Sequence, residues 1–315
     1  MGAAVTIVSA GEILAEFIAV DAAGVPIDAS GQDPQLYAGP FPSGAPAIAA
    51  DQAARCGAPT QMFGAVGDDL FGRAIVSRLK EGGTDVSGIE IAQDAPTGTA
   101  HVAYHGDGSR AFVFHIEGSA AERCLVPAVP AGAILMVSGS TLGIPALRAA
   151  VLDAAVRVRK AGGRIAVDPN VRAELMREPG AASALNALLA GADFATPSEE
   201  DLAALMPGAS VAEAAASLRE SGIDTVAVTC GAGGVRVFHP GGELALDGHA
   251  VDVVDPTGAG DAFAATFVAT RAAGASVAEA ARFANAAGAL AVTRLGPMEG
   301  NSSLGKIRAF LGDGG

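Results

Sequence analysis

Short runs of hydrophobic residues alternate along the chain with longer segments whose apolar positions recur at helical spacing. The short runs are rich in β-branched residues and largely lack polar alternation, which is typical of strands buried in a parallel sheet. They lie at residues 5–10, 60–66, 133–139, 164–169, 192–197 and 224–231. The helical segments lie at residues 44–56, 68–81, 144–161, 180–190, 199–206 and 211–221. This alternation predicts an α/β fold, a three-layer α/β/α sandwich with a mostly parallel central sheet.

The helical pattern is nearly continuous toward the end of the chain. It spans residues 257–295, and Gly274-Ala275-Ser276 predicts a break within it. Residues 303–311 predict a short terminal helix. The stretch GNSSLGKI at 300–307 nearly matches a P-loop, but Ile307 stands where the magnesium-binding hydroxyl is required and no strand precedes it. We therefore expect no P-loop here.

Two stretches depart from the strand–helix rhythm. Residues 12–37 and 90–117 contain runs that alternate between hydrophobic and polar positions, and GDGS at 106–109 predicts a hairpin turn. Such strands between α/β units predict a small separate sheet, a lid over the carboxyl ends of the main strands where α/β folds bind ligands. Residues 24–46 are rich in Gly and Pro and predict a loop with little regular structure. We expect one domain, residues 1–315, with the lid inserted in it.

The composition narrows the classes of molecule that the protein is expected to bind. Half of the 315 residues are hydrophobic, yet no apolar run reaches membrane-spanning length, and the start lacks the basic region of a signal peptide. The formal net charge is −14 and basic residues form no cluster, so we expect neither a nucleic-acid nor a membrane partner. Cys56, Cys124 and Cys230 are widely spaced, which favours reduced thiols in a cytoplasmic protein.

The loop at residues 252–263, DVVDPTGAGDAF, carries the strongest chemical signal. Glycines before a helix leave its first N–H groups free, so Gly258, Ala259 and Gly260 can cradle an anion. Asp261 follows in the first helical turn. A lone Asp at a helix start commonly just complements the helix dipole. A carboxylate beside an anion cradle has a further use in phosphoryl transfer, where it accepts the proton of the attacking hydroxyl.

Five segments resemble signatures of the ribokinase-like, or PfkB, carbohydrate kinases. DPTGAGDAF resembles the family's C-terminal signature, and FGAVGDDLFG resembles its N-terminal glycine-rich one. TCGAGG resembles the family's nucleotide-binding strand and turn. FANAAGALAVTRLG resembles the helix and loop that flank the adenine and a monovalent cation in the family. DPNVR resembles a segment of fructokinase-like and 2-keto-3-deoxygluconate kinase-like members. The segments follow the family's order and span nearly the whole chain.

The resemblance implies roles for the nucleotide side of the site. Asp261 would be the base, with Gly258, Ala259 and Gly260 as the anion hole. Residues near ATP would be Ser198, Thr229, Gly231, Gly233, Gly234 and Asn285. Asp255 and Thr257 resemble the family's K⁺ loop. Mg²⁺ must bridge the ATP phosphates, and where the family often carries N-x-x-E this chain has Ser198 and Asp201, which equally fit a helix capping box.

The resemblance also implies a sugar site, with departures. PSGAPAIAAD places Ser43, Gly44, Ala45 and Ile48 where sugar-binding members carry a G-G-x-x-A-N-like stretch, and Ile48 cannot bond a hydroxyl. The other implied substrate contacts are Glu16, Arg110, His115, Asn170 and Arg172.

GPFPSGAPAI resembles a tagatose kinase branch, so we expect an ATP-dependent kinase of a tagatose- or fructose-like ketohexose. Three alternatives stay open. A 2-keto-3-deoxygluconate kinase would need Arg172 and Arg110 on the substrate carboxylate. A nucleoside kinase would need an aromatic sandwich for its base, and the chain has no Trp and two Tyr. A non-catalytic sugar- or nucleotide-binding protein would have the fold of the family without its kinase activity. In this family lids often pair edge to edge, so a homodimer through the lid is also expected.

Overall fold

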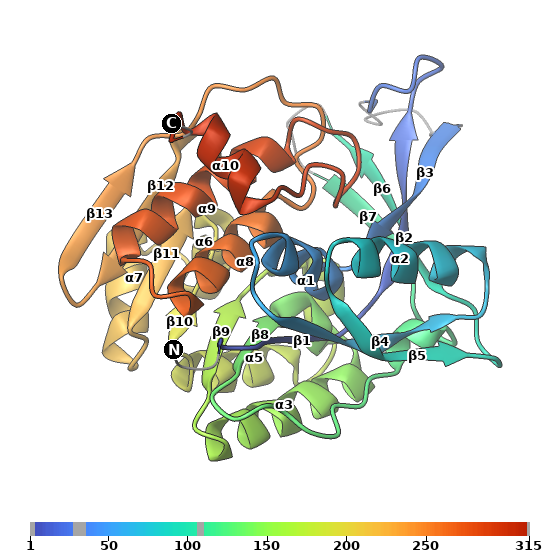
Figure 1. Cartoon of the computed structure of the whole chain (residues 1–315), viewed down its shortest axis with the longest axis horizontal. Coiled ribbons are helices and arrows are strands. Elements are labelled where there is room, and N and C mark those ends of the chain that lie inside the picture. The colour runs from blue at the N-terminus through green and yellow to red at the C-terminus, as the bar shows by residue number, and fades with distance from the viewer. Residues whose placement is uncertain (1–3, 28–35, 106–109, 314–315) are drawn as a thin grey trace.

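The larger of two β-sheets runs through the middle of the structure (Figure 1), a computed structural model that describes residues 4–27, 36–105 and 110–313. The strands of this sheet follow the order β13-β12-β11-β10-β9-β8-β1-β4-β5. Those from β11 to β5 pair in parallel, and β12 and β13 add an antiparallel edge beside β11. Their bounds are β1 Ile7–Ala10, β4 Thr60–Gly67, β5 Asp85–Ala92, β8 Ile134–Ser138, β9 Arg164–Asp168, β10 Phe194–Ala195, β11 Thr225–Thr229, β12 Val235–His239 and β13 Gly242–Leu246.

Helices cover both faces of this sheet. One face carries α3 (Pro145–Lys160), α5 (Ala181–Ala190), α6 (Glu199–Leu205) and α7 (Val211–Glu220). The other carries α1 (Ala45–Arg55), α8 (Ala259–Ala272) and α9 (Val277–Ala291), with α2 (Leu70–Glu81) packed near α1 and α10 (Leu304–Phe310) against α9. The short α4 (Ala173–Met176) follows β9. The predicted three-layer sandwich and the break between the last long helices are therefore confirmed.

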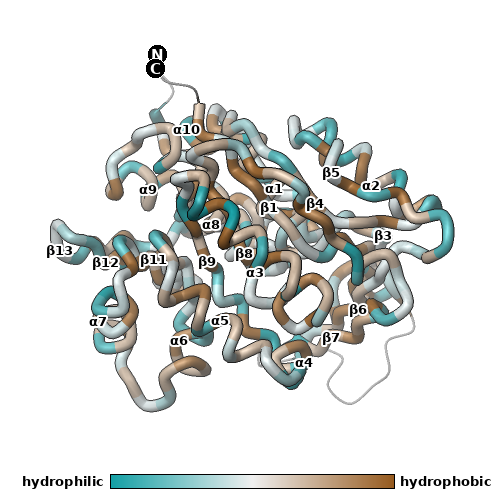
Figure 2. The backbone as a smooth tube through the Cα atoms, turned by 90° about the horizontal axis from the view of Figure 1, so that it is seen from below, coloured by the Kyte–Doolittle hydropathy of each residue, from teal (hydrophilic) through white to brown (hydrophobic). Residues whose placement is uncertain are grey.

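Alternation along the strands divides the core between the two helical layers. In β1, Ile7 packs with α1 and α8, whereas its neighbour Val8 packs with α3 and α5. In β8, Ile134 likewise packs with α1 and α8, and its neighbour Leu135 packs with α3 and α5. Figure 2 shows hydrophobic residues concentrated along central strands such as β4 and β9. A strand buried on both faces has no need of polar alternation, which is why these runs are continuously apolar.

The smaller sheet, here called the lid, lies to one side of the main sheet (Figure 1). Its strands follow the order β3-β2-β6-β7, with bounds β2 Leu14–Val20, β3 Leu36–Ser43, β6 Gly98–Tyr104 and β7 Arg110–His115. Strands β2 and β6 pair in parallel, and the other two pairs are antiparallel.

The structure corrects several boundaries. The predicted loop at 24–46 contains β3, a strand whose Gly and Pro residues hid it. Residues 90–92, predicted to be in the lid, belong to β5 of the main sheet. The hydrophobic pattern also predicted neither β12 nor β13, and the predicted strand at 192–197 is reduced to the two residues of β10. The predicted turn at 106–109 lies outside the described residues.

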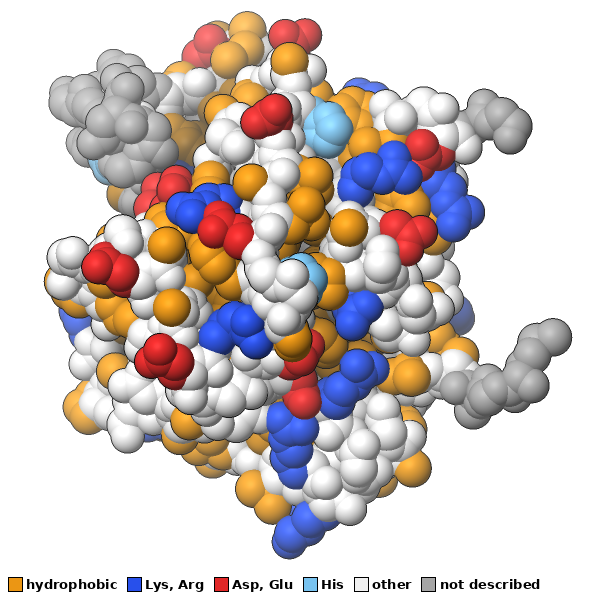
Figure 3. Space-filling model, turned by 90° about the vertical axis from the view of Figure 1, so that its left-hand side faces the viewer, with side chains coloured by type: hydrophobic (Ala, Val, Ile, Leu, Met, Phe, Trp, Pro, Cys, Tyr) orange, Lys and Arg blue, Asp and Glu red, His pale blue; other side chains and the backbone are white. Residues whose placement is uncertain are grey.

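Charges of both signs are interspersed on the face of the molecule that Figure 3 presents. At the edge of the main sheet, Arg236 of β12 and Glu243 of β13 form an ion pair with Nη2 and Oε1 2.7 Å apart. The charge of Arg236 is thus balanced locally at this edge. In the described part of the chain, none of the helices has both the length and the apolar character that a membrane crossing requires.

Candidate active site

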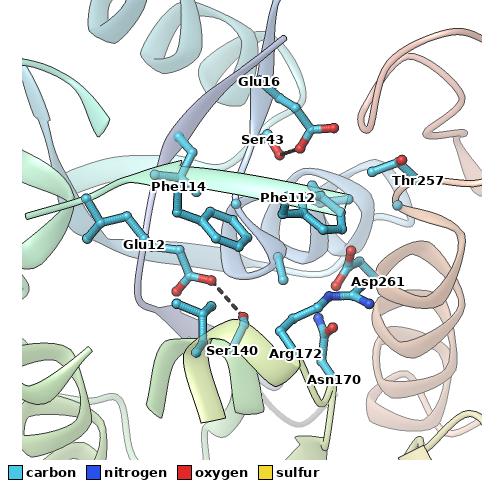
Figure 4. A pocket seen from close by; sticks show the side chains of 17 residues that line it. Glu12, Glu16, Ser43, Phe112, Phe114, Ser140, Asn170, Arg172, Thr257 and Asp261 are labelled. Atoms are coloured by element: carbon cyan, nitrogen blue, oxygen red, sulfur yellow. Dashed lines mark hydrogen bonds between the residues drawn. The ribbon is translucent and has the colours of Figure 1, made fainter. Parts of the chain in front are cut away.

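A pocket lies between the lid and the main sheet, where β2, β7, the start of α1, the segment after β9 and the start of α8 meet (Figure 4). The predicted site residues that line it are Glu16, Ser43, Gly44, Ala45, Ile48, Asn170, Arg172, Thr257, Gly258 and Asp261. These residues are distant in sequence, and the fold brings them to one cavity.

The loop before α8 has the geometry of an anion cradle. Gly258 has a φ of 81°, and a Cβ at this position would lie 2.2 Å from the Pro297 carbonyl oxygen, so a side chain does not fit there. Helix α8 begins at Ala259, and around Gly260 there is open space. The first amides of a helix have no intrahelical acceptor and lie at the positive end of its dipole. This loop can therefore hold a phosphoryl group.

Asp261 lies in the first turn of α8, beside Arg172 in the pocket (Figure 4). Burial raises the pKa of Asp261 to about 7, and the charges of Glu12 and Asp201 act in the same direction. Arg172 and Arg110 oppose this rise, because they stabilise the ionised carboxylate. A carboxylate with a pKa near neutrality is well matched to accept a proton at neutral pH.

Glu16 faces Asp261 across the pocket from the lid (Figure 4). Its side chain is buried, and burial raises its pKa to about 7. The Ser43 hydroxyl, which donates a hydrogen bond to it, has the opposite effect. Strand pairing in the lid places these two residues together, since β2 and β3 run antiparallel. Glu16 and Ser43 thus present polar groups to the pocket, and their contact with a substrate stays a prediction.

Strand β7 presents aromatic rings to the pocket. Phe112 and Phe114 line it as stacked rings whose centroids are 5.4 Å apart. Because successive side chains of a strand point to opposite faces, His115 lies on the other side of the lid. There its ring meets His101 edge-on, with centroids 5.4 Å apart, and lines a separate groove. His115 is therefore absent from the lining of this pocket, where Phe112 and Phe114 stand instead, and its contact with a substrate stays a prediction.

Two arginines act on the same pocket. Arg172 lines it and lies over the Phe112 ring, with Cζ 5.6 Å from the ring centroid. Arg110, the first residue of β7, is partly buried; burial lowers its pKa, and the charge of Arg172 lowers it further. Both guanidinium groups favour the ionised forms of Glu16 and Asp261. Positive charge therefore accumulates where two acids face each other.

Glu12 is a pocket residue that the sequence analysis missed. Its carboxylate accepts hydrogen bonds from Ser140 at 2.7 Å and Thr141 at 2.6 Å (Figure 4 draws the first). Burial raises the pKa of Glu12, and these two hydrogen bonds partly oppose the rise. A signal was present in the sequence, because Glu12 follows the first predicted strand at its carboxyl end, where ligands of α/β folds bind.

The predicted nucleotide-binding residues lie outside the lining of this pocket, around the end of β11 and on α9. Thr229 ends β11 and pairs with Ser198 in an isolated parallel bridge. Gly231–Gly233 form a 3₁₀ turn, and Gly234 follows with a φ of 93°. Asn285 on α9 donates a hydrogen bond of 2.8 Å to a main-chain carbonyl just after β13. The role of these residues in binding ATP stays a prediction.

Ser198 and Asp201 form the capping box of α6. Ser198 Oγ accepts a hydrogen bond from the Asp201 amide, and Asp201 Oδ2 accepts from the Ser198 amide and hydroxyl. Asp201 Oδ1 accepts from the Val171 amide at 2.7 Å. The capping interpretation is thus confirmed, while a role for Asp201 in holding Mg²⁺ stays a prediction.

Asp255 is fully buried next to the anion loop. Its Oδ1 accepts hydrogen bonds from the Tyr104 hydroxyl and from the Thr257 amide, the latter at 2.9 Å. Its Oδ2 accepts from the Gly296 amide at 2.8 Å. Asp255 therefore ties together the segments predicted to hold K⁺, and that metal role stays a prediction.

Comparison with known proteins relates this chain to a family of enzymes. The model of the pfkB family carbohydrate kinases matches residues 6–304. A fructokinase from Vibrio alginolyticus is 34% identical over 282 residues, which cover 86% of this chain and 92% of the relative. A 2-dehydro-3-deoxygluconokinase from Thermoproteus tenax is 36% identical over 248 residues, 76% of each chain.

Among solved structures, the fructokinase from Vibrio cholerae O395 with bound fructose, ADP and calcium ion superposes with a TM-score of 0.86. The two proteins are 28% identical, and the match covers 98% of this chain and all of the other. The likeness thus extends over the main sheet and the lid alike.

Proposed function

This chain belongs to the pfkB family of carbohydrate kinases. We propose that it uses ATP to phosphorylate a hydroxyl group of a ketohexose that resembles tagatose or fructose. The observation that carries the proposal is the position of Asp261 in the pocket, beside the glycine loop and opposite Glu16. The fructokinases among its relatives support the choice of a ketohexose.

The pocket residues divide the work of the transfer. The Asp261 carboxylate accepts the proton of the attacking sugar hydroxyl. The freed oxygen bonds to the γ-phosphorus of ATP, and the bond from that phosphorus to the β–γ bridging oxygen breaks. Amides of Ala259 and Gly260 stabilise the charge on the transferring group. Glu16 and Ser43 orient the sugar through its other hydroxyls, while Phe112 and Phe114 cover its ring and exclude water.

A bound Mg²⁺ would neutralise part of the charge of the nucleotide phosphates, and Asp201 is the residue predicted to hold it. The residues that the structure describes contain no cluster of three or more His, Cys, Asp or Glu side chains arranged for a metal. Both oxygens of Asp201 and both of Asp255 already accept hydrogen bonds. We therefore assign no step of the transfer to a metal held by protein carboxylates.

A panel of acceptors tests the proposal. ADP release is measured with fructose, tagatose, 2-dehydro-3-deoxygluconate and a ribonucleoside, each with ATP and Mg²⁺. We expect the highest kcat/KM with one of the two ketohexoses. No turnover with any acceptor would leave a binding protein of the same fold, and a preference for the nucleoside would overturn the ketohexose assignment.

The sugar acid is the second candidate, and the two arginines favour it. Arg172 lines the pocket and Arg110 lies close to it, and a guanidinium group is a natural partner for a substrate carboxylate. If the sugar acid is the substrate, Arg172→Gln lowers kcat/KM for it by about 100-fold. The matched control is Arg177→Gln, since Arg177 is exposed on the same segment and should leave kcat/KM unchanged.

The lid also supports a homodimer. Its outer strands carry exposed hydrophobic side chains, among them Leu36 at 50% and Val113 at 57% exposure. Exposed apolar side chains on sheet edges favour pairing with a second copy. Sedimentation velocity on the wild type and on Leu36→Lys with Val113→Lys tests this, and we expect a dimer that the double substitution dissociates.

A further inference from the structure

Tyr104 reaches from the lid into the loop that precedes α8. It is the last residue of β6, and its ring packs inside the lid with Val102 and Phe112. Its hydroxyl donates a hydrogen bond to Asp255 Oδ1 and lies 2.8 Å from the Thr257 hydroxyl. Since a phenol has one proton, the Thr257 hydroxyl is the donor in the second contact. One side chain of the lid thus engages two residues of the loop.

The main chain of the loop is also tied to the body of the protein, because the amides of Val254 and Asp255 donate hydrogen bonds to the Val292 carbonyl at 2.8 and 3.2 Å. Asp255 is fully buried and forms no ion pair among the described residues, so its hydrogen bonds and the nearby charge of Arg110 offset its own charge. Its donors are the Tyr104 hydroxyl and the amides of Thr257 and Gly296. Two of these donors belong to the main body, and the third comes from the lid. Removal of the phenol therefore leaves a buried carboxylate short of one donor.

The position of this loop sets the position of the anion cradle. Thr257 and Gly258 both line the pocket, and Gly258 is wedged against the carbonyl of Pro297. Asp255 holds Thr257 on one side and Gly296 on the other. A shift of Asp255 is therefore transmitted to Gly258 from both sides, because the chain between these residues is short.

We propose that Tyr104 is a positioning residue whose hydroxyl couples the closed lid to the phosphoryl-binding loop through Asp255 and Thr257. The inference rests on the proposed function, because it concerns the step at which that loop meets the transferring group. Tyr104 does not itself line the pocket, and it contacts the pocket residues Thr257 and Phe112 from behind. It acts by holding the loop only while the lid covers the sugar, so that the anion cradle is complete when water is excluded.

A purely structural role in the lid predicts a different result. A loosened lid would weaken its cover over the sugar and so raise the sugar KM. A displaced loop would leave sugar binding intact and lower kcat, because the loop acts on the transferring group. The division between KM and kcat therefore separates the two roles.

The kinetic test compares Tyr104→Phe with Tyr37→Phe. The chain has two tyrosines, and Tyr37 lies on the outer face of the lid, where its ring meets His101 and is 43% exposed. With fructose, or tagatose where the panel gives the faster turnover, we expect Tyr104→Phe to lower kcat by about 10- to 100-fold. The sugar KM should change by less than about threefold. Tyr37→Phe should match the wild type. A loss confined to KM, or a kcat within twofold of the wild type, overturns the proposal.

Hydrogen–deuterium exchange tests the coupling without turnover. In Tyr104→Phe we expect peptides that span residues 253–262 to exchange at least about tenfold faster than in the wild type. Peptides of α3 and α5 should keep their wild-type rates, which shows that the variant is folded. Unchanged exchange in the loop contradicts the proposal. If the wild type phosphorylates no sugar, the proposed function fails, and this measurement still decides whether Tyr104 holds the loop.

Discussion

Glu16 Oε2 accepts a hydrogen bond from the Ser43 hydroxyl at 2.7 Å, while Glu16 Oε1 is buried and has no hydrogen-bond partner among the described residues. A buried acceptor without a donor costs free energy. A hydroxyl of the substrate can supply the missing donor, so the free protein is less stable at this point than it could be. Binding and stability therefore oppose each other at Glu16.

The substitution Glu16→Gln should raise the stability of the free protein in a pH-dependent way. The pKa of Glu16 is raised from 4.5 to about 7, so between these pH values the folded protein keeps a proton that the unfolded chain has lost. Wild-type stability thus falls as the pH rises through this window. We expect Glu16→Gln to raise the free energy of unfolding by about 1–3 kcal/mol at pH 8, with little gain at pH 4.5. Urea denaturation at both pH values checks this, with the exposed Glu117→Gln as control.

Asp261→Asn should remove the base. We expect kcat to fall by about 10²–10⁴-fold while the KM for ATP stays within threefold. In the wild type, kcat/KM should rise with pH through about 7, because the protonated carboxyl cannot accept a proton. This limb should persist in Glu16→Gln and vanish in Asp261→Asn. Asp252→Asn, an exposed acid just before the loop, should behave as wild type. A near-normal rate in Asp261→Asn would remove Asp261 from the mechanism.

The two glycines of the anion loop should respond differently to alanine. Gly258→Ala places a methyl group 2.2 Å from the Pro297 carbonyl oxygen at a positive φ, so both stability and kcat should fall, the former by roughly 2 kcal/mol or more. Gly260→Ala meets no atom within 4 Å and adds a helix former to α8, so stability should rise by up to about 1 kcal/mol. Its kcat should still fall, because a methyl group would fill the open space beside the amides proposed to bind the phosphoryl group. Thermal denaturation and kinetics on both variants check this, and an active Gly260→Ala would argue against close contact with the phosphoryl group.

Asp201→Asn should reveal a structural role. Its oxygens accept from Val171 and from Ser198, which joins the segment after β9 to the start of α6. We expect a loss of about 1–3 kcal/mol in the free energy of unfolding, with the Mg²⁺ concentration for half-maximal rate unchanged. Glu213→Gln changes the equivalent residue of the exposed capping box of α7 and should cost about 0.5 kcal/mol or less. A large rise in the Mg²⁺ requirement of Asp201→Asn would instead indicate a metal role.

The sequence predicts this fold well where hydrophobic periodicity and parallel pairing agree. The strands that the main helices cover are continuous apolar runs. The glycine loop before α8 predicts an anion site from its local sequence alone. Strand β3 escaped prediction because Gly39, Pro40 and Pro42 mask it, and only its pairing with β2 makes it a strand. The edge strands β12 and β13 also escaped prediction, because no α-helix separates them from each other or from β11. The motif did not predict the face of the lid on which His115 lies, because a position in a motif does not fix a face, whereas the alternation of β7 does.

The lid is assembled from two stretches of chain that flank α1, β4, α2 and β5. Its strands β2 and β3 precede this block and β6 and β7 follow it, with β2 and β6 as the parallel seam between the halves. Neither half is a self-sufficient module, so a transplant between relatives has to exchange both halves together to preserve the seam. Recombination within the intervening block would create chimaeras with mismatched partners along that seam, and breakpoints before β2 or after β7 are the ones that keep parental pairs intact.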